Sequence, residues 1–533
     1  MKRHLLVLLI LVGFALSNNA QTINDPFFTP VSYIGAFDGT NDWTSGWTEW
    51  DPVNKVYPAP TVTKGNGLFS RATGTHITSN ETWSGTILLD GWIYVDDGAE
   101  LTIDPGTIIR GTNKSALVIE RGGKIKAIGT VDNPIVFTSN QGEGLRANSD
   151  WGGIVLCGKA PNNLTGGEGI AEGGIESPYG GTDINDNSGV MKYVRIEFPG
   201  YEIATGKEVN GLTFCSVGRN TQIDYVQVSH SGDDGYEWFG GTVNAKHLIS
   251  YKTEDDDFDT DNGFIGRVQF GVIARDSSIV DTDAANGFES DNNEAGTNIM
   301  PKTHAIFSNI SAFGPAATAS EPTVLRTRHA EGSAMRIRRN SRLQIYNSIF
   351  AGFGRGLRIE SEGSYTAATI DSLTVQNTFI AGIRGSWFQT DAAAGADAVR
   401  DWFLNAERNN DTLTQNSALK ITAPFNYSAR NFQPMAGSPV FNASSWYRQP
   451  DASHTINNDF FTKVTYSGAF DGTNNWTTGW AEWDPQNKVY PDGTTTKGNG
   501  LFSRSTGTHI AADETWSGNI LLDGWVYVTT ALH

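Results

Sequence analysis

V-Q-V-S-H (226–230), L-I-S-Y-K (248–252) and F-G-V-I-A (270–274) are three strand-like runs at a regular spacing, because their first residue numbers rise by 22 from run to run. Turn residues such as Gly, Asn and Asp separate the runs, and no helix-length pattern lies between them, which argues against alternating βαβ units. A period of about 22 residues fits one coil of a solenoid, in which each coil stacks on the last and buries a continuous core. The stretch therefore predicts an all-β fold, a parallel β-helix.

The same pattern extends in both directions from this stretch. Short runs of alternating apolar residues begin at Leu101, Ala116 and Pro134. An N-x4-G spacing recurs from Asn309, Asn347 and Asn377, and it predicts inward Asn side chains that hydrogen-bond from coil to coil. One amphipathic helix is predicted over residues 391–408, with Val399, Trp402, Phe403 and Ala406 on one face.

Alternation along the three central runs predicts which side chains enter the core. Residues two apart in a strand share a face. The predicted inward set is Val226, Val228, Leu248, Phe270 and Val272, and the predicted outward pair is Gln227 and Gly271.

A long duplication marks the ends of the chain. Residues 22–95 align without a gap onto residues 455–528, with 56 of 74 positions identical and a constant offset of 433. Both copies contain G-A-F-D-G-T-N-x-W-T-x-G-W-x-E-W-D-P and end in I-L-L-D-G-W-x-Y-V. The predicted organisation is a signal peptide (1–20), a Trp-rich module (21–91), the β-helix (92–443), a linker (444–454) and a second Trp-rich module (455–533) that is cut short. Ile87–Val95 is predicted to form the first rung, and the second copy to form a separate lobe beyond a cleavable linker.

Composition and the first residues predict an exported protein. A basic start, Met1-Lys2-Arg3-His4, precedes an apolar run at residues 5–16 that is too short to span a bilayer, as in a secretory signal peptide. The net charge of -19 argues against nucleic acid as a partner, because phosphates require Lys and Arg. The two cysteines, Cys157 and Cys215, are interpreted as buried free thiols, with a disulfide as the alternative in an oxidising compartment.

Several motifs carry a family resemblance. These are the strand runs at Leu101, Ala116 and Pro134, the stretch R-R-N-S-R-L-Q-I-Y-N-S-I-F-A-G-F-G-R-G-L from Arg338, and Y-x-G-A-F-D-G-T-N-x-W. The chain resembles exported right-handed parallel β-helix surface proteins of Gram-negative bacteria that use type IX secretion. The resemblance implies a right-handed helix and a cell-surface or extracellular location, and it carries no catalytic residue.

An acidic stretch is the predicted metal site. The run D-D-G-Y-E (233–237) is followed by E-D-D-D-F-D-T-D-N-G (254–263) and D-T-D (281–283). The 22-residue period places Glu237, Asp259 and Asp281 on successive coils, about 4.8 Å apart. Stacked carboxylates repel one another unless a hard cation such as Ca²⁺ joins them. The predicted structural calcium ligands are Glu237, Asp257, Asp259, Asp261, Asp281 and Asp283; the alternative is solvated turn residues.

A catalytic interpretation starts from the same acidic stretch. β-Helix polysaccharide lyases use Asp-bound calcium with Arg or Lys as base, and Lys252 and Arg275 are the candidate bases here. A glycoside hydrolase needs two carboxylates about 5–9 Å apart, which Asp233, Asp234 and Asp257 can supply. The preferred hypothesis is a non-enzymatic surface protein for adhesion or glycan contact, and the alternative is a calcium-dependent polysaccharide lyase or hydrolase acting on an acidic glycan.

Two further sets of side chains leave glycan binding open. Nine basic residues between Arg326 and Arg358 form either a strip for an anionic glycan or ion pairs with nearby Glu residues; ion pairs are preferred. The duplicated module holds ten of the fifteen Trp, interpreted mainly as core. The candidate sugar-stacking residues are Trp43, Trp47, Trp50, Trp476, Trp480 and Trp483.

Overall fold

The chain is analysed through a computed structural model. It describes residues 34–37, 42–204, 207–281, 285–315, 328–426, 430–441, 443, 460–464, 466–469, 476, 495–498, 508–510, 520–523 and 526–528. The predicted signal peptide (1–20) and linker (444–454) lie outside these residues. The compact units divide the chain between Asp484 and Pro485, inside the second copy, rather than at the predicted linker.

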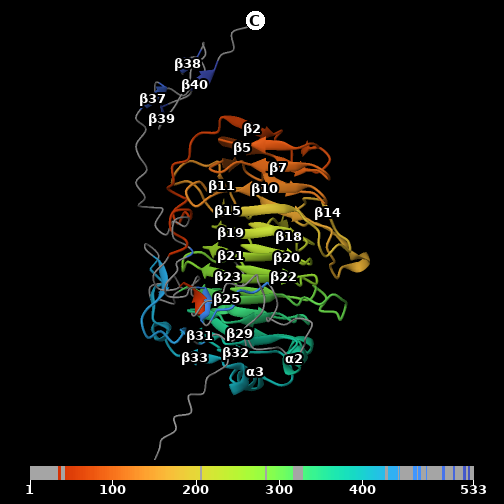
Figure 1. The fold of residues 1–533 in the computed structure, drawn as a ribbon, viewed down its shortest axis with the longest axis vertical. Coiled ribbons are helices and arrows are strands. Elements are labelled where there is room, and N and C mark those ends of the chain that lie inside the picture. The colour runs from red at the N-terminus through yellow and green to blue at the C-terminus, as the bar shows by residue number, and fades with distance from the viewer. Residues whose placement is uncertain are drawn as a thin grey trace, which may run out of the picture. The chain divides into compact units, whose positions relative to one another are not determined.

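The first unit is a right-handed parallel β-helix, with strands stacked rung upon rung (Figure 1). One wall is an eleven-stranded parallel sheet. Its strands are β3 (Thr75–Ile77), β6 (Trp92–Val95), β9 (Ala116–Ile119), β12 (Gly153–Cys157), β18 (Leu212–Cys215), β20 (Tyr236–Phe239), β22 (Phe258–Asp261), β24 (Phe288–Ser290), β26 (Ser333–Ile337), β29 (Arg355–Ile359) and β32 (Phe388–Gln389).

The other wall is a seventeen-stranded sheet that bends along its length, here called the bent sheet. Its strands are β2 (Val62–Gly65), β4 (Glu81–Trp83), β5 (Thr86–Asp90), β7 (Glu100–Ile103), β8 (Ile108–Gly111), β10 (Lys124–Ile128), β11 (Ile135–Ser139), β15 (Gly189–Glu197), β19 (Gln222–Ser229), β21 (Asn244–Tyr251), β23 (Arg267–Ala274), β25 (Ile306–Phe313), β27 (Gln344–Tyr346), β28 (Ile349–Ala351), β30 (Thr374–Gln376), β31 (Phe379–Ala381) and β33 (Asp411–Leu413). Early and late rungs use two short strands where the middle rungs use one long strand.

A column of left-handed residues makes the bend. The backbone φ is positive, between 50° and 61°, at the corner residue of eight successive rungs. These residues are Tyr193, Tyr225, His247, Phe270, Asn309, Asn347, Asn377 and Asn409. Asn tolerates this conformation best among residues with a side chain, which accounts for the recurring Asn of the late rungs. Asn409 donates a 3.1 Å hydrogen bond to Asn377, so part of the predicted Asn contact between coils is present.

The four aromatic members of this column, here called the corner stack, lie face to face. Ring centroids are 4.5 Å apart for Tyr193 and Tyr225, 4.1 Å for Tyr225 and His247, and 5.1 Å for His247 and Phe270. Their side chains pack outside the coil rather than with the interior, against two covering segments, one within residues 42–58 and the other within residues 460–469. Asn309 likewise donates to the carbonyl of Tyr466 in a covering segment, so the prediction of an inward side chain is wrong at Asn309.

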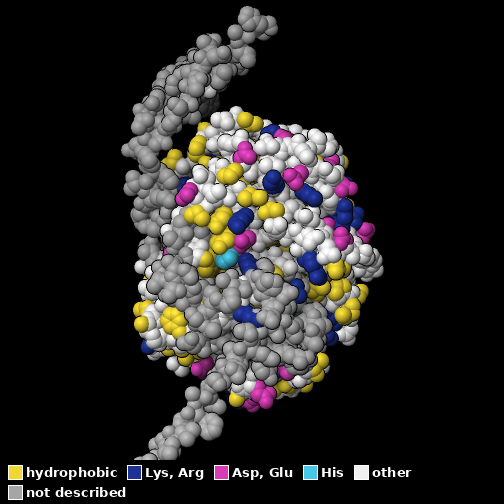
Figure 2. All heavy atoms as spheres, in the orientation of Figure 1, with side chains coloured by type: hydrophobic (Ala, Val, Ile, Leu, Met, Phe, Trp, Pro, Cys, Tyr) yellow, Lys and Arg dark blue, Asp and Glu magenta, His cyan; other side chains and the backbone are white. Residues whose placement is uncertain are grey.

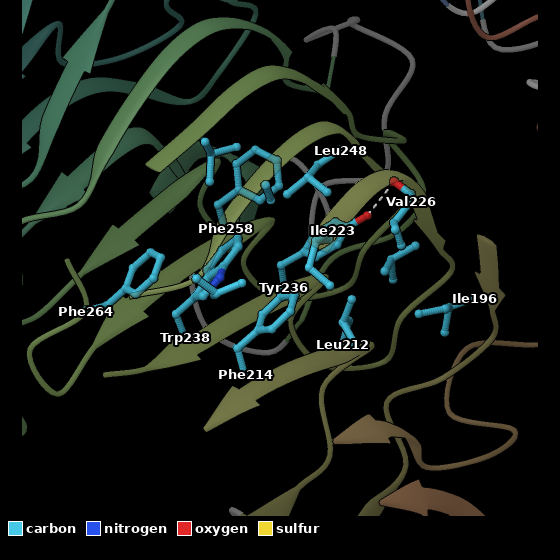
Figure 3. Close-up of a cluster of buried hydrophobic side chains, with 14 of the residues drawn as sticks. Ile196, Leu212, Phe214, Ile223, Val226, Tyr236, Trp238, Leu248, Phe258 and Phe264 are labelled. Carbon is cyan, nitrogen blue, oxygen red and sulfur yellow. Dashed lines mark hydrogen bonds between the residues drawn. The ribbon is translucent and has the colours of Figure 1, made fainter. Parts of the chain in front are cut away.

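The interior of the coil is a continuous apolar core. Figure 3 shows Phe214, Tyr236, Trp238 and Phe258 packed together, with Val226 and Leu248 facing them from the bent sheet. The Tyr236 hydroxyl donates to the carbonyl of Val226 at 2.8 Å, so this polar group is satisfied inside the core. The predicted inward positions of Val226, Val228 and Leu248 are confirmed.

The predicted inward positions of Phe270 and Val272 are wrong. Val226 pairs with Leu248 as the 22-residue period requires, but Leu248 pairs with Gly271 because the next coil is one residue longer. A slip of one residue moves every side chain of a strand to the other face. Phe270 and Val272 therefore belong to the outer cluster, and Gly271 faces inward toward Ile310 and Phe258.

The first copy of the duplication is part of the helix itself. β2 pairs with β5 and β3 pairs with β6, so residues from Val62 onward already form rungs, before the predicted start at residue 92. In the second unit, β37 (Thr495–Gly498) pairs with β39 (Ile520–Asp523), and β38 (Thr508–Ile510) pairs with β40 (Val526–Val528). These are the same pairings at an offset of 433, so equal sequence gives equal local structure.

A few elements decorate the helix. Helix α2 spans Glu362–Thr369, and α3 spans Ala396–Phe403, within the predicted helical range and with Val399 and Phe403 buried. Antiparallel pairs join β13 (Glu168–Ile170) to β14 (Pro178–Gly180), β16 (Glu202–Ala204) to β17 (Lys207–Glu208), and β34 (Ile421–Ala423) to β35 (Asn431–Pro434). Among the described residues, no helix is long and apolar enough to span a membrane.

Candidate functional site: a carboxylate stack on the eleven-stranded sheet

Three carboxylates stack in register on the eleven-stranded sheet. Glu237 of β20 pairs with Asp259 of β22, and Asp259 pairs with Glu289 of β24. Their strand neighbours Tyr236, Phe258 and Phe288 belong to the interior core, so the carboxylates point away from it. The register continues to an arginine, because Glu289 pairs with Arg336 of β26.

Turn residues complete an acidic cluster beside this stack. The cluster comprises Asp233, Asp234, Glu237, Asp255, Asp256, Asp259 and Glu289. Within it, three groups of three carboxylates each bring one oxygen per residue to within 4.8 Å of one another. The Asp234 carboxylate also accepts a 2.9 Å hydrogen bond from the backbone amide of Asp256, which ties the two turns together.

Burial dominates the electrostatics of the cluster. It raises the pKa of Asp234, Glu237, Asp256 and Asp259 well above the ordinary values, and neighbouring carboxylates raise each pKa further. One oxygen of Asp259 is buried without a hydrogen-bond partner in the described part of the chain. A buried carboxylate oxygen without a donor is costly, and a bound cation would supply the missing partner.

Positive charge meets the cluster at Glu289. Arg336 and Arg338 both form ion pairs with Glu289, and Arg336 also pairs with Glu360. Arg338 and Arg339 pair with Asp291, Arg358 pairs with Glu360, and Arg355 pairs with Glu331. The preferred interpretation as ion-pair partners is therefore confirmed for these five arginines.

The predicted metal ligands are only partly brought together. Glu237 and Asp259 lie in the cluster. Asp281 is not in register with Asp259, because the coil there is longer and Glu289 takes that position. Asp261 is the last residue of β22 and is not a member of the cluster. Burial raises its pKa to about 7. Asp283 lies outside the described residues.

Asp257 lies apart from these carboxylates. It forms a buried ion pair with Arg275 at 2.7 Å and accepts a hydrogen bond from Ser250 at 2.6 Å. Burial raises the pKa of Asp257 to about 6 despite the neighbouring Arg275. Its carboxylate is engaged inside the coil and does not reach the cluster.

The candidate bases are held by structural contacts. The side chain of Arg275 is 1% exposed and donates to Asp257 and to the carbonyls of Thr253, Asp255 and Asn286. Lys252 pairs with Asp276 at 3.4 Å and lies over the Tyr251 ring. Burial alone would lower the pKa of Lys252, but Tyr251 and Asp276 outweigh it and raise this pKa. Both side chains are thus engaged in ion pairs, and their catalytic role stays a prediction.

The hydrolase candidates Asp233 and Asp234 do lie together. Their oxygens, with one from Asp255, fall within 4.8 Å of one another. Burial is the largest cause that raises the pKa of both Asp233 and Asp234. Asp257 is not available to act with them, because Arg275 holds it.

The first-copy tryptophans are covered. Trp43 and Trp47 are fully buried and Trp50 is 2% exposed, so none presents an open ring face to a sugar. Trp476 is partly buried, and Trp480 and Trp483 lie outside the described residues. Cys157 and Cys215 are free, buried and directly in register on β12 and β18.

Sequence reasoning missed Glu289, Asp255 and Asp256 as cluster members. Asp255 and Asp256 belong to the acidic run 254–263. They lie beside Asp234 and Asp259 because of the way neighbouring strands pair, which the sequence does not show. Asp259 pairs with Glu289, well beyond Asp281, so a constant 22-residue period cannot find Glu289.

The geometry defines a class: a right-handed parallel β-helix that carries a stack of carboxylates on one outer face. The model of the pectate-lyase-like β-helix domain matches residues 74–423, about two thirds of the chain. The chain belongs to this family. Comparison with curated proteins and with solved structures gives no match.

Proposed function

We propose that this protein is an exported β-helix protein that contacts an acidic polysaccharide through a calcium ion bound at the acidic cluster. The family is compatible with a carbohydrate-related role. The observation that carries the proposal is the register of Glu237, Asp259 and Glu289, which places carboxylates on three successive rungs.

Calcium suits this donor set. Ca²⁺ takes six to eight oxygens at about 2.3–2.6 Å, so ligands on opposite sides of one ion lie about 5 Å apart. The groups of carboxylate oxygens within 4.8 Å of one another match that span. Asp259, which has the unpartnered oxygen, belongs to two of the three groups and is the central ligand of the proposal.

A bound calcium also gives the glycan a point of attachment. The carboxylate of a uronate sugar can complete the coordination sphere of a partly exposed calcium ion. Figure 2 shows one face of the molecule, where Lys and Arg side chains are interspersed with Asp and Glu. No broad single-signed patch dominates the described side chains of that face.

The test is calcium-dependent stability with matched variants. Calcium should raise the melting temperature of the full chain, because a ligand bound to the native state stabilises it by mass action. Asp259→Asn should abolish most of this rise, and the exposed control Asp132→Asn should retain it. Identical melting curves in calcium and in chelator would contradict the proposal.

A second candidate is a calcium-dependent lyase for the same acidic glycan. Arg336 favours it, since this arginine follows the carboxylate stack in register, as a base beside a metal site would. However, Glu289 and Glu360 outweigh burial and raise the pKa of Arg336, which makes it a poor proton acceptor. Incubation with a panel of uronate polymers decides the matter: unsaturated products identify a lyase, and binding without products supports the non-enzymatic role.

The location follows the predicted signal peptide. We propose export to the cell surface or the extracellular space, by type IX secretion in a Gram-negative bacterium as the resemblance implies. A fusion of the segment 1–24 to a reporter tests the first step, because the reporter should leave the cytoplasm and be cleaved near Ala20 and Gln21.

A further inference from the structure

An insertion between β12 and β15 covers the first part of the outer face of the eleven-stranded sheet. It contains the antiparallel pair of β13 and β14, and residues 164–180 are here called the hairpin. Figure 1 shows β14 at the side of the coil. The hairpin and the sheet share an apolar cluster, whose buried members include Ala171, Ile175 and Tyr179 from the hairpin and Tyr94, Val118 and Val155 from the sheet.

The row of outward side chains on the sheet changes from apolar to acidic where the hairpin ends. Tyr94, Val118 and Val155 are in register on successive strands, beneath the hairpin. The register continues through Thr213 to Glu237, the first member of the carboxylate stack. The hairpin therefore borders the acidic cluster on one side.

A carboxyl group of the hairpin meets Glu237 at this border. The side-chain amide of Asn210 donates to Glu172 of the hairpin at 2.9 Å and to Glu237 at 2.5 Å. The Glu172 and Glu237 carboxyl groups also lie close enough for a side-chain hydrogen bond between them. Two ionised carboxylates so close repel each other unless a proton or a cation lies between them.

Asn210 gives an independent indication that a ligand is missing at this position. Asn210 is 0% exposed, and its Oδ1 has no hydrogen-bond partner among the described residues. A buried amide oxygen without a donor is costly. Carboxamide and carboxylate oxygens are both calcium ligands, so an ion beside Glu172 and Glu237 would supply the partner that Oδ1 lacks.

We propose that Glu172, Asn210 and Glu237 form a second calcium site, and that its ion holds the hairpin against the acidic end of the sheet. Without the ion, ionised Glu172 and Glu237 repel each other, and the hairpin opens more often above the apolar row. With the ion, the row stays covered. The inference rests on the proposed function for the choice of calcium, but not on the ion bound by Asp259 or on glycan binding.

The test is hydrogen–deuterium exchange of the full chain in calcium chloride and in chelator. Calcium should slow exchange at the amides of residues 168–180, because exchange there requires the hairpin to open. Glu172→Gln removes a charged ligand, so its hairpin should exchange equally fast in calcium and in chelator. The control Glu176→Gln, at an exposed position of the same hairpin, should keep the calcium response of the wild type.

A second variant, Asn210→Asp, tests the role of the amide. It replaces the donor between Glu172 and Glu237 with a third carboxylate. Its melting temperature in chelator should fall below that of the wild type, because the three charges then repel one another. Calcium should raise the melting temperature of Asn210→Asp by more than it raises that of the wild type, since a more negative ligand set binds the ion more tightly. Equal calcium responses in the two proteins would overturn the assignment of Asn210.

The exchange data also separate this inference from the proposed function. The inference is overturned if calcium leaves hairpin exchange in the wild type unchanged, or if Glu172→Gln responds to calcium as Glu176→Gln does. Either result can occur while Asp259→Asn still abolishes most of the calcium-dependent rise in melting temperature, and the proposed function then stands. If Asp259→Asn keeps the whole rise and Glu172→Gln loses the hairpin response, the proposed function fails and the second site stands.

Discussion

Arg275 offers a decisive perturbation, because it separates a structural role from a catalytic one. Its guanidinium lies inside the turn that precedes β22 and pairs with Asp257 at 2.7 Å. It also donates to the carbonyls of Thr253 at 3.1 Å, Asp255 at 2.8 Å and Asn286 at 3.0 Å. Arg275→Met keeps a side chain of similar length and removes every one of these donors.

The expected cost is about 3–5 kcal/mol of unfolding free energy, the usual loss when one member of a buried ion pair is removed. Asp257 is 0% exposed at its side chain, so water cannot replace Arg275 there. The double variant Arg275→Met with Asp257→Asn should recover part of the loss, because the uncompensated charge is gone. Lys252→Met, which breaks a longer and more exposed pair, should cost less.

The destabilisation caused by Arg275→Met should depend on pH. Burial raises the pKa of Asp257 from an ordinary value of 3.8 to about 6, and Arg275 opposes that rise. Without Arg275 the pKa should rise further, so at pH about 5 the carboxyl is largely neutral with or without Arg275, whereas at pH about 8 its ionisation is unfavourable in the variant alone. The cost of Arg275→Met should therefore be smaller at the lower pH.

Urea unfolding at the two pH values measures these quantities. A loss below about 1 kcal/mol that Asp257→Asn does not rescue would refute the argument that burial dominates. Turnover lost in a fully stable variant would instead restore Arg275 as a catalytic candidate.

Three further outcomes follow from the described contacts. Leu248→Asp should prevent soluble expression, because it buries an unpaired charge. The control Leu145→Asp, at a residue that is 73% exposed, should be tolerated. Equal yields of soluble protein for the two variants would show that the assigned register of β21 is wrong. In chelator, thermal stability should be highest below pH about 4 and fall as the pH rises, because burial raises the pKa of the cluster carboxylates Asp234, Glu237 and Asp259 well above their ordinary values. Calcium bound at the cluster should flatten this curve, and a curve without slope in chelator would contradict the argument. Asn347, with φ of 50°, donates to Ser308 at 3.2 Å, so Asn347→Gly should cost about 1 kcal/mol in urea unfolding for the lost hydrogen bond. Asn347→Val should cost about 1–2 kcal/mol more, because it adds backbone strain, and the reverse order would exclude strain as the reason for Asn there.

Much of the fold could be predicted from the sequence, because the same spacing of 22 residues separates the strand runs that begin at Val226, Leu248 and Phe270. Val226 and Leu248 are one period apart, and they pair on adjacent rungs. The period then lengthens, slightly where Leu248 pairs with Gly271 and by several residues where Asp259 pairs with Glu289. Extra residues leave the strands paired but shift which residue pairs with which, so Phe270 and Asp281 were misplaced.

The covering segments could not be predicted for a different reason. Tryptophans beside Asp, Asn and Glu fit a sugar site or a core equally well by composition. Only the tertiary contact of Trp43 and Trp47 with Tyr193 and Tyr225 shows that the rings are buried against the coil corner. The αL column that presents those tyrosines has no signature in single rungs, because Tyr and Phe seldom adopt this conformation.

The carboxylate stack and the arginines beyond it constrain how an acidic glycan can bind. Arg336 and Arg338 already pair with Glu289, and Asp291 accepts from Arg338 and Arg339. A uronate that bound these arginines directly would have to break existing ion pairs and leave Glu289 or Asp291 unpaired, at a cost close to what the new pair returns. A uronate that bound through calcium would break none, and it would reduce the repulsion among Glu237, Asp259 and Asp234. Glycan binding and calcium binding should therefore be lost together in Asp259→Asn, and glycan binding that survives in chelator would place recognition on the arginines instead.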